Sequence, residues 1–145
     1  MRLLILQLTD YTDRAYAYVQ GSLGKVFADR PGLDLQGPFF TVAVKEGASE
    51  IWHIDWNDDV NTITWVIPVG NWEGGEFCIA QLGVRIPIRP GQVLGVRAKL
   101  LAHCSAPVAS GKRVVFTCFT DFMVHLKAAQ IGYGRGIVPT VFTAE

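Results

Sequence analysis

The residues best suited to chemistry in this sequence are two histidines, an aspartate and an arginine. His53 and Asp55 lie two positions apart, His103 follows fifty residues after His53, and Arg113 lies ten residues further on. Two imidazoles and one carboxylate can occupy one face of an octahedral Fe(II) ion and leave three positions open for small molecules. An arginine at this spacing suits the far carboxylate of a 2-oxo acid bound to the same ion. Together they predict an oxygenase-type metal centre rather than a passive binding domain.

Other interpretations of these residues remain open. A single His-x-Asp pair is more often a surface or hydrogen-bonded histidine than a pair of ligands. His125 is an alternative third ligand, because Arg135 also follows it by ten residues. His125 lies beyond the last predicted strand, so we prefer His103. Zinc is the alternative metal, because two histidines, a carboxylate and water also suit a catalytic zinc; the arginine favours iron.

The acidic stretch after the motif offers a third interpretation, a calcium loop. Asp55, Asn57 and Asp59 have the alternate spacing with which an EF-hand loop begins. That loop needs glycine at its sixth position and glutamate at its twelfth, and this chain has valine at both. We therefore interpret Asp58 and Asp59 as solvated turn residues.

Arg113 opens a predicted strand that is otherwise mostly apolar. Burying an unpaired guanidinium is costly, so the simplest interpretation places Arg113 at a strand edge in water. The functional interpretation makes it a bidentate clamp on a carboxylate. Thr117 lies on the same face of the strand and could add a hydroxyl contact. The four tryptophans are interpreted as core or packing residues.

Sequence patterns predict the elements that position these residues. Residues 12–29 carry an apolar stripe at helical spacing, with Thr12 as a candidate cap and Arg30-Pro31-Gly32 as the end. After residue 38, short stretches rich in Val, Ile, Phe, Thr and Trp alternate with turn signals such as Ser110-Gly111. The expected strands are 39–45, 51–56, 62–69, 76–80, 84–88, 92–97, 103–108 and 113–120.

Short strands at regular spacing favour a sandwich over βαβ units. We predict an all-β core of about eight strands, a double-stranded β-helix or jelly roll, behind an N-terminal helix, α+β overall. The chain is expected to form one domain, 1–145, with helical support at 1–38, the jelly-roll core at 39–121 and an irregular tail at 122–145. Alternation along a strand points His53 and Asp55 to the same side, towards the interior.

Composition excludes several classes of protein. Half of the 145 residues are apolar and 18% are charged, which excludes a disordered chain. No apolar run is long enough to span a membrane, and the first eight residues are interpreted as folded structure rather than a signal remnant. The formal net charge is zero, so composition gives no argument for nucleic-acid binding. Three cysteines without a CxxC pair fit a reducing compartment, so we expect an intracellular protein, nuclear or cytoplasmic.

An ordered set of motifs resembles the Fe(II)/2-oxoglutarate-dependent dioxygenases, and most of all their TET/J-binding-protein-like branch with its fungal members. The resemblance covers about residues 50–121. The motifs are His53-Ile54-Asp55, Gly74-Gly75, Arg89-Pro90-Gly91, His103 and Arg113.

The resemblance implies a fold, a cofactor set and an activity. It makes His53, Asp55 and His103 the iron ligands, and Arg113 the residue that binds the distal carboxylate of 2-oxoglutarate. O2 would be the oxidant, and a substrate C–H bond would be oxidised. For this branch, the substrate would be the methyl group of 5-methylcytosine or thymine in nucleic acid. The alternative is a non-catalytic or degenerate jelly-roll module that binds a ligand or partner. The sequence makes no prediction of oligomeric state.

Overall fold

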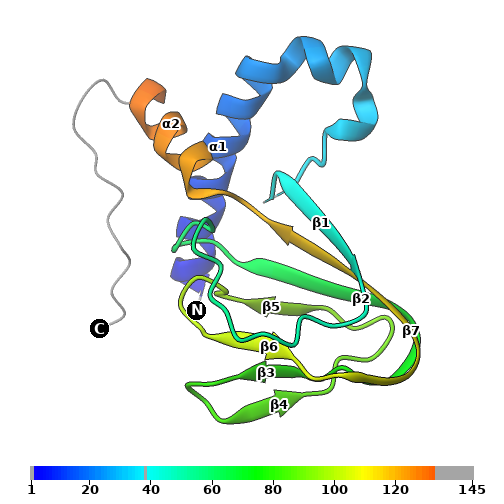
Figure 1. Cartoon of the computed structure of the whole chain (residues 1–145). Coiled ribbons are helices and arrows are strands. Elements are labelled where there is room, and N and C mark those ends of the chain that lie inside the picture. The colour runs from blue at the N-terminus through cyan, green and yellow to red at the C-terminus, as the bar shows by residue number, and fades with distance from the viewer. Residues whose placement is uncertain (1, 38, 133–145) are drawn as a thin grey trace.

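The computed structural model describes residues 2–37 and 39–132, and the side chains of residues 8–37 and 39–131 (Figure 1). A long helix comes first, strands fill the middle of the chain, and a second helix follows them. In chain order the elements are α1 (Arg2–Asp29), η1 (Pro31–Leu33), β1 (Thr41–Glu46), β2 (Thr64–Gly74), β3 (Phe77–Ile79), β4 (Val84–Ile86), β5 (Leu94–Val96), β6 (His103–Ser105), β7 (Val108–Phe119) and α2 (Phe122–Gly132).

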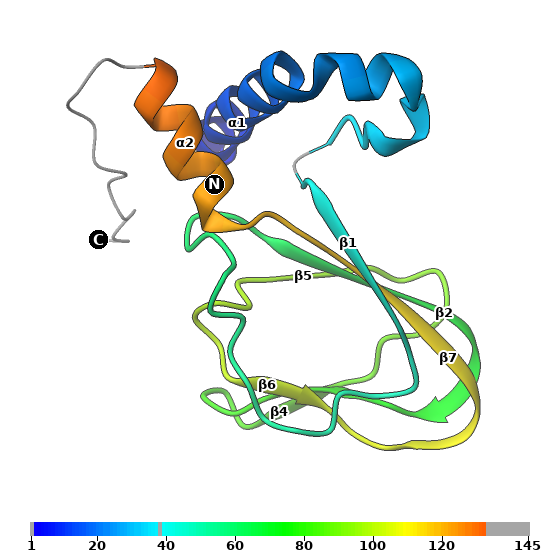
Figure 2. The same cartoon turned by 45° about the horizontal axis from the view of Figure 1, so that its top comes forward.

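The strands form two antiparallel sheets. The four-stranded sheet has the order β1-β7-β2-β5, and the three-stranded sheet has the order β4-β3-β6. Figure 2 shows the two sheets facing each other below the helices. The protein is therefore mostly β with an N-terminal helix, an arrangement compatible with a β-sandwich. Both sheets contribute to the main apolar core, which contains Val66, Phe77, Ile79, Ile88, Val96, Ala98 and Val115.

The strands β2 and β7 are longer than the sequence predicted. β7 begins at Val108 rather than at residue 113, and the expected turn at Ser110-Gly111 lies inside it. Gly111 pairs with Trp72 on β2 and has a φ of 81°. A Cβ at this position would lie 2.1 Å from the Asn71 carbonyl oxygen, so only glycine allows the strands to approach here. The glycine that indicated a turn instead permits close pairing of two long strands.

The N-terminal helix starts earlier than expected. α1 begins at Arg2, and Thr12 lies inside it rather than at its start. The Thr12 hydroxyl donates to the carbonyl oxygens of Leu8 and Thr9, at 3.0 and 2.9 Å, so the predicted capping role is wrong. The helix ends at Asp29, and Pro31 opens the short η1 turn as the sequence indicated. No helix in the described part of the chain is long and apolar enough to cross a membrane.

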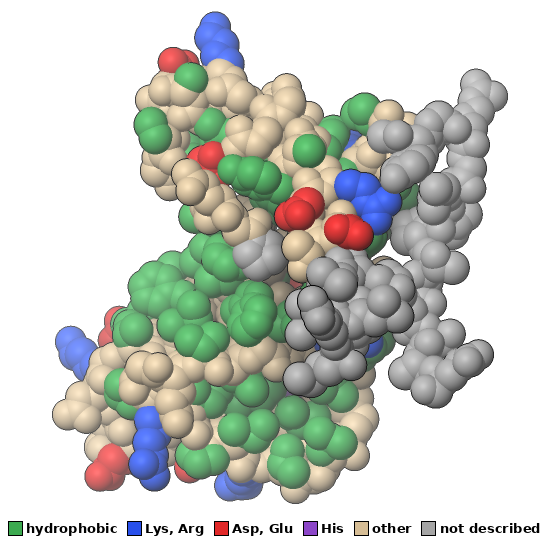
Figure 3. All heavy atoms as spheres, turned by 180° about the vertical axis from the view of Figure 1, so that it is seen from behind, with side chains coloured by type: hydrophobic (Ala, Val, Ile, Leu, Met, Phe, Trp, Pro, Cys, Tyr) green, Lys and Arg blue, Asp and Glu red, His purple; other side chains and the backbone are tan. Residues whose placement is uncertain are grey.

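The segment after β7 is a helix where an irregular tail was expected. α2 covers residues 122–132, and the remaining predicted tail, 133–145, lies outside the described residues. The Met123 amide donates to the Asp121 carboxylate at 2.8 Å, which is the bond of an N-terminal cap. α2 packs against α1, and these helices form a layer separate from the sheets. Seen from behind, apolar side chains spread over the strand layer below the helices (Figure 3).

Candidate metal centre

The predicted strand 51–56 is reduced to a single bridge beside β6. The His53 amide donates to the His103 carbonyl oxygen at 3.0 Å, and the His103 amide donates to the His53 carbonyl oxygen at 2.9 Å. The Asp55 amide donates to the Ala98 carbonyl oxygen at 3.2 Å. These backbone bonds hold both ends of the His53–Asp55 motif against the sheet, although the segment is not a regular strand.

The three side chains that the sequence singled out as ligands lie together. The Nε2 atom of His53 lies 3.7 Å from Oδ1 of Asp55, and Nε2 of His103 lies 3.8 Å from Oδ2 of the same carboxylate. All three donor groups lie within 4.8 Å of one another. The separations from Asp55 are too long for hydrogen bonds. They leave room for an ion about 2.1 Å from each donor, as for a first-row metal.

Both imidazoles are held in the tautomer that a metal needs. Nδ1 of His53 lies 2.7 Å from the Ile51 carbonyl oxygen, and Nδ1 of His103 lies 2.7 Å from the Leu101 carbonyl oxygen. A carbonyl oxygen only accepts, so each Nδ1 carries the proton. In the neutral rings, Nε2 therefore presents a lone pair towards Asp55. Such outer hydrogen bonds orient metal-binding histidines, so the donor set fits a metal ion without rearrangement.

The three side chains line a cavity of about 380 Å³ between the two sheets. His103 forms its deep side, with a side chain that is 7% exposed. The His53 and Asp55 side chains are 40% and 29% exposed, so the centre opens to solvent on their side. A small molecule can therefore reach the donor set from the cavity.

Arg113 lies in the wall of the same cavity and is buried, with 2% of its surface exposed. The interpretation as a strand-edge residue in water is therefore wrong. Its Nη1 donates to the Gly47 carbonyl oxygen at 3.0 Å, while Nε has no partner among the described residues. Burial lowers the pKa of the guanidinium. A buried cation without a carboxylate partner is costly, so this side chain is suited to an anion that enters the cavity.

Gly75 gives Arg113 its space. A Cβ on Gly75 would lie 3.2 Å from Cδ and 3.4 Å from Nε of Arg113. Gly75 also has a φ of 68°, a conformation that side chains rarely adopt. Thr117, on the same face of β7, lines the cavity as its position in the strand predicted.

The two acidic residues after the motif are not solvated. Asp58 is 4% exposed, lines the cavity and accepts a hydrogen bond from the Thr64 hydroxyl. Burial raises the pKa of Asp58 to about 6, although the Thr64 bond acts against this shift. Asp59 is 6% exposed and accepts from the Tyr11 hydroxyl and the Asn61 amide, both at 2.8 Å. The prediction of solvated turn residues is therefore wrong for both.

The alternative ligand His125 lies elsewhere in the fold. It belongs to α2, is 3% exposed, and stacks on Tyr11 of α1 with ring centroids 4.1 Å apart. The structure thus groups His103, and not His125, with His53 and Asp55. Arg135, the partner proposed for His125, lies outside the described residues.

Two tryptophans depart from the expected packing role. Trp52 is 53% exposed and Trp56 is 73% exposed, because they alternate with His53 and Asp55 and face away from the cavity. Lys45 also lines the cavity, from β1, and was not among the site residues predicted from the sequence. The available signal was its charge at the end of the predicted apolar strand 39–45, on the same face as Ala43.

Comparison with known proteins gives a likeness in fold. No protein-family model matches the chain, and no curated protein matches it. The solved structure of NgTET1 in complex with 5mC DNA is similar, with a TM-score of 0.55 and 15% sequence identity. The similarity covers 71% of this chain and 47% of that chain, so this protein spans about half the length of NgTET1 in that structure. At this identity the likeness concerns the fold and indicates a distant relationship only.

Proposed function

We propose that this protein is an Fe(II)- and 2-oxoglutarate-dependent dioxygenase. The observation that carries the proposal is one cavity whose wall holds two kinds of group. It holds His53, Asp55 and His103 with both Nε2 atoms turned to the carboxylate, and it holds the buried Arg113, whose Nε has no partner among the described residues. The motif resemblance and the fold likeness to NgTET1 support the same class.

The order of the strands supports a double-stranded β-helix. When the bridge at His53 is counted as a short strand beside β6, successive strands alternate between the two sheets except at β3 and β4, which are neighbours in the same sheet. β1, β2, β5 and β7 lie in one sheet, and the His53 segment, β3, β4 and β6 lie in the other. Counted in this way, the arrangement is compatible with the two layers of four strands that we propose for a jelly roll.

In this proposal, the three ligand side chains form the two-histidine, one-carboxylate face that suits Fe(II). When bound, iron and 2-oxoglutarate supply the oxidising chemistry: O2 is consumed, 2-oxoglutarate becomes succinate and CO2, and a substrate C–H becomes C–OH. The carbonyl oxygens of Ile51 and Leu101 keep both imidazoles oriented. Arg113 pairs with the distal carboxylate and sets the direction in which the co-substrate lies.

The substrate that the comparisons favour is the methyl group of a pyrimidine in nucleic acid. NgTET1 in the similar structure is in complex with 5mC DNA, and the motifs in this sequence resemble the same branch. A base inside a duplex would have to leave the stack to reach a cavity of this kind.

The test is anaerobic binding of Fe(II) and 2-oxoglutarate, followed by turnover in air. The wild-type chain should give a weak visible charge-transfer band, and succinate should appear when methylated DNA or RNA is added. Both His53→Ala and Asp55→Ala should lose the band and the succinate. Undiminished turnover in either variant contradicts the proposal. A wild-type chain that binds metal without the band would instead be a binding module.

A further inference from the structure

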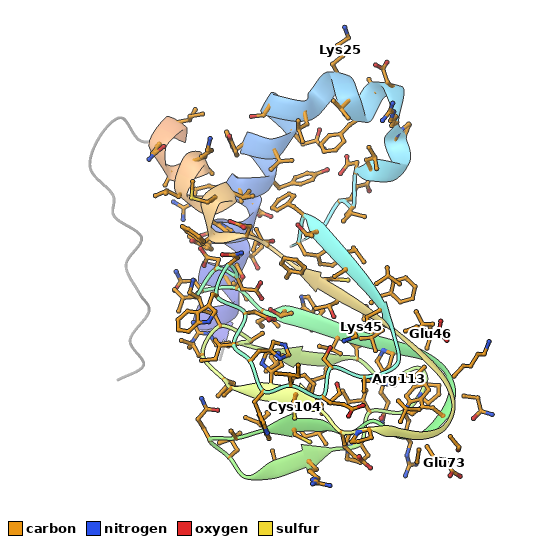
Figure 4. All side chains as sticks on the ribbon, viewed as in Figure 1. Lys25, Lys45, Glu46, Glu73, Cys104 and Arg113 are labelled. Atoms are coloured by element: carbon orange, nitrogen blue, oxygen red, sulfur yellow. The ribbon has the colours of Figure 1, made fainter. Side chains whose placement is uncertain are left out.

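A second cationic side chain, Lys45, lines the same cavity as Arg113. Lys45 belongs to β1 and Arg113 to β7, and these two strands pair directly. Nζ of Lys45 donates to the Ser49 hydroxyl at 3.0 Å, and Nη1 of Arg113 donates to the Gly47 carbonyl oxygen at 3.0 Å. Both head groups thus end on the same short turn, and Figure 4 shows the two residues at the same end of the sandwich.

The two cations differ in their access to solvent. Arg113 is 2% exposed, whereas Lys45 is exposed on its edge strand. Lys45 therefore lines the cavity where it meets solvent, and Arg113 lines its buried part. A molecule held by Arg113 fills the buried part, which leaves Lys45 accessible to a second molecule.

The loaded site is electrically balanced without Lys45. Fe(II) and Arg113 together carry three positive charges under the proposed function. Asp55 and the two carboxylates of 2-oxoglutarate carry three negative charges. The other carboxyl group of the wall, Asp58, is hydrogen-bonded to Thr64 on β2, and β7 separates β2 from β1. Lys45 is therefore not needed to balance the charges inside the loaded cavity.

We infer that Lys45 binds a phosphate group of a nucleotide substrate beside the group that is oxidised. The inference rests on the proposed function and adds a residue that recognises the substrate. The ammonium of lysine is a compact, hydrated point charge that binds phosphate well at a solvent-exposed position. It also supplies locally the positive charge that the chain as a whole, with zero net charge, does not provide.

A different role for Lys45 is protection of the sheet edge. β1 is an outer strand of its sheet, and a charged side chain that points inwards discourages pairing with another chain. That role requires a charge on the strand but no contact with substrate. A binding experiment that compares ligands with and without a phosphate group therefore distinguishes the two roles.

The experiment measures binding to the full chain loaded with Fe(II) and 2-oxoglutarate under anaerobic conditions. Calorimetry at low salt compares 5-methyl-2′-deoxycytidine with its 5′- and 3′-monophosphates. We expect one monophosphate to bind at least about tenfold more tightly than the nucleoside. Lys45→Met should remove this preference, and Lys45→Arg should keep most of it. Lys112→Met is the matched control, because Lys112 is an exposed lysine of β7.

Three results would overturn the inference. The first is a phosphate preference that survives in Lys45→Met, or that Lys112→Met reduces equally. The second is a loss of 2-oxoglutarate affinity in Lys45→Met, which would assign Lys45 to the co-substrate. The third is a wild-type chain that binds 2-oxoglutarate but shows no phosphate preference, which leaves the proposed function standing. A wild-type chain that fails to bind 2-oxoglutarate overturns both proposals.

Discussion

The two buried histidines, His103 and His125, have similar exposure but very different surroundings. His103 is 6% exposed and His125 is 3% exposed. His103 lies on a strand, donates through Nδ1 to a carbonyl oxygen, and presents Nε2 to Asp55 in a cavity. His125 lies on a helix, stacks on Tyr11, and its Nε2 has no partner among the described residues. One ring is prepared to bind a ligand, and the other is packed.

This difference shows what spacing alone leaves open. Each of the two histidines is followed by an arginine ten residues later. What separates them is the element on which each lies, because only a strand beside His53 brings a second imidazole to the same carboxylate. Burial therefore does not identify a functional histidine, whereas a fixed tautomer and an open donor atom do.

The largest expected effect is a loss of Fe(II) affinity when His103, but not His125, is replaced by a residue that cannot bind metal. His103→Ala should lower Fe(II) affinity by at least about 100-fold, because a direct ligand is lost where even outer partners are worth 10–100-fold. His125→Phe should leave Fe(II) affinity unchanged, because the ring only packs against Tyr11. Metal content after equilibrium dialysis measures both. An equal loss of Fe(II) affinity in the two variants would mean that the substitutions act through folding and not through metal ligation.

The next effect concerns the buried cation near the centre. Arg113→Met should weaken 2-oxoglutarate binding by about 100-fold, as expected for a charge-assisted bidentate pair worth about 3 kcal/mol. It should also leave the chain folded and at least as stable, because it removes a buried charge that has no carboxylate partner among the described residues. Anaerobic titration and thermal unfolding measure the two effects. Arg113→Lys is the control and should recover part of the affinity. A variant that unfolds while retaining affinity would make Arg113 a structural residue.

The sequence predicted the grouping of His53, Asp55 and His103 better than it predicted their surroundings. His53 and Asp55 share a face because of simple alternation, and this holds even though the segment is bridged only at His53. The placement of His103 required only that its strand return beside that segment. These are short-range patterns joined by one pairing, so residue types, spacing and the predicted strand 103–108 together were sufficient to group the three side chains.

The burial of polar groups was not predictable in the same way. Asp59 is buried because Tyr11, 48 residues away, donates to it from a helix. Asp58 is buried because the Thr64 hydroxyl, on β2, donates a hydrogen bond to its carboxylate. Acidic residues next to Asn57 indicate a turn in any sequence, and only tertiary partners decide whether that turn faces water. The helix α2 was not predicted because its cap, Asp121, follows the end of β7 at Phe119 after a single residue, and no turn residues separate the strand from the helix.

A smaller effect is expected from Asp58, whose folded-state pKa of about 6 lies above the ordinary value of 3.8. The folded chain therefore holds this proton more tightly than the unfolded chain does. Stability should fall as the pH rises from about 4 to 6, by on the order of 1–2 kcal/mol. Asp58→Asn should remove this fall, because the amide oxygen still accepts from Thr64 and carries no charge. Urea unfolding of the metal-free chain between pH 4 and 6 measures the change in stability. If stability fell equally with pH in Asp58→Asn, the fall would not come from Asp58.

The smallest expected effect has the opposite sign and belongs to His125. Burial lowers the pKa of His125 below its ordinary value of 6.5, although the Asp59 carboxylate nearby acts against the shift. The unfolded chain then binds this proton more readily, so stability is complete above pH 6.5 and declines as the pH falls below it. His125→Phe keeps the stack on Tyr11 and removes the titration, so its advantage over wild type should grow towards pH 5. Because the two chains differ only at residue 125, the difference between their unfolding curves isolates His125. A constant difference between pH 5 and 8 would show that the packed histidine carries no charge-dependent cost, and the contrast between the two rings would then rest on the metal alone.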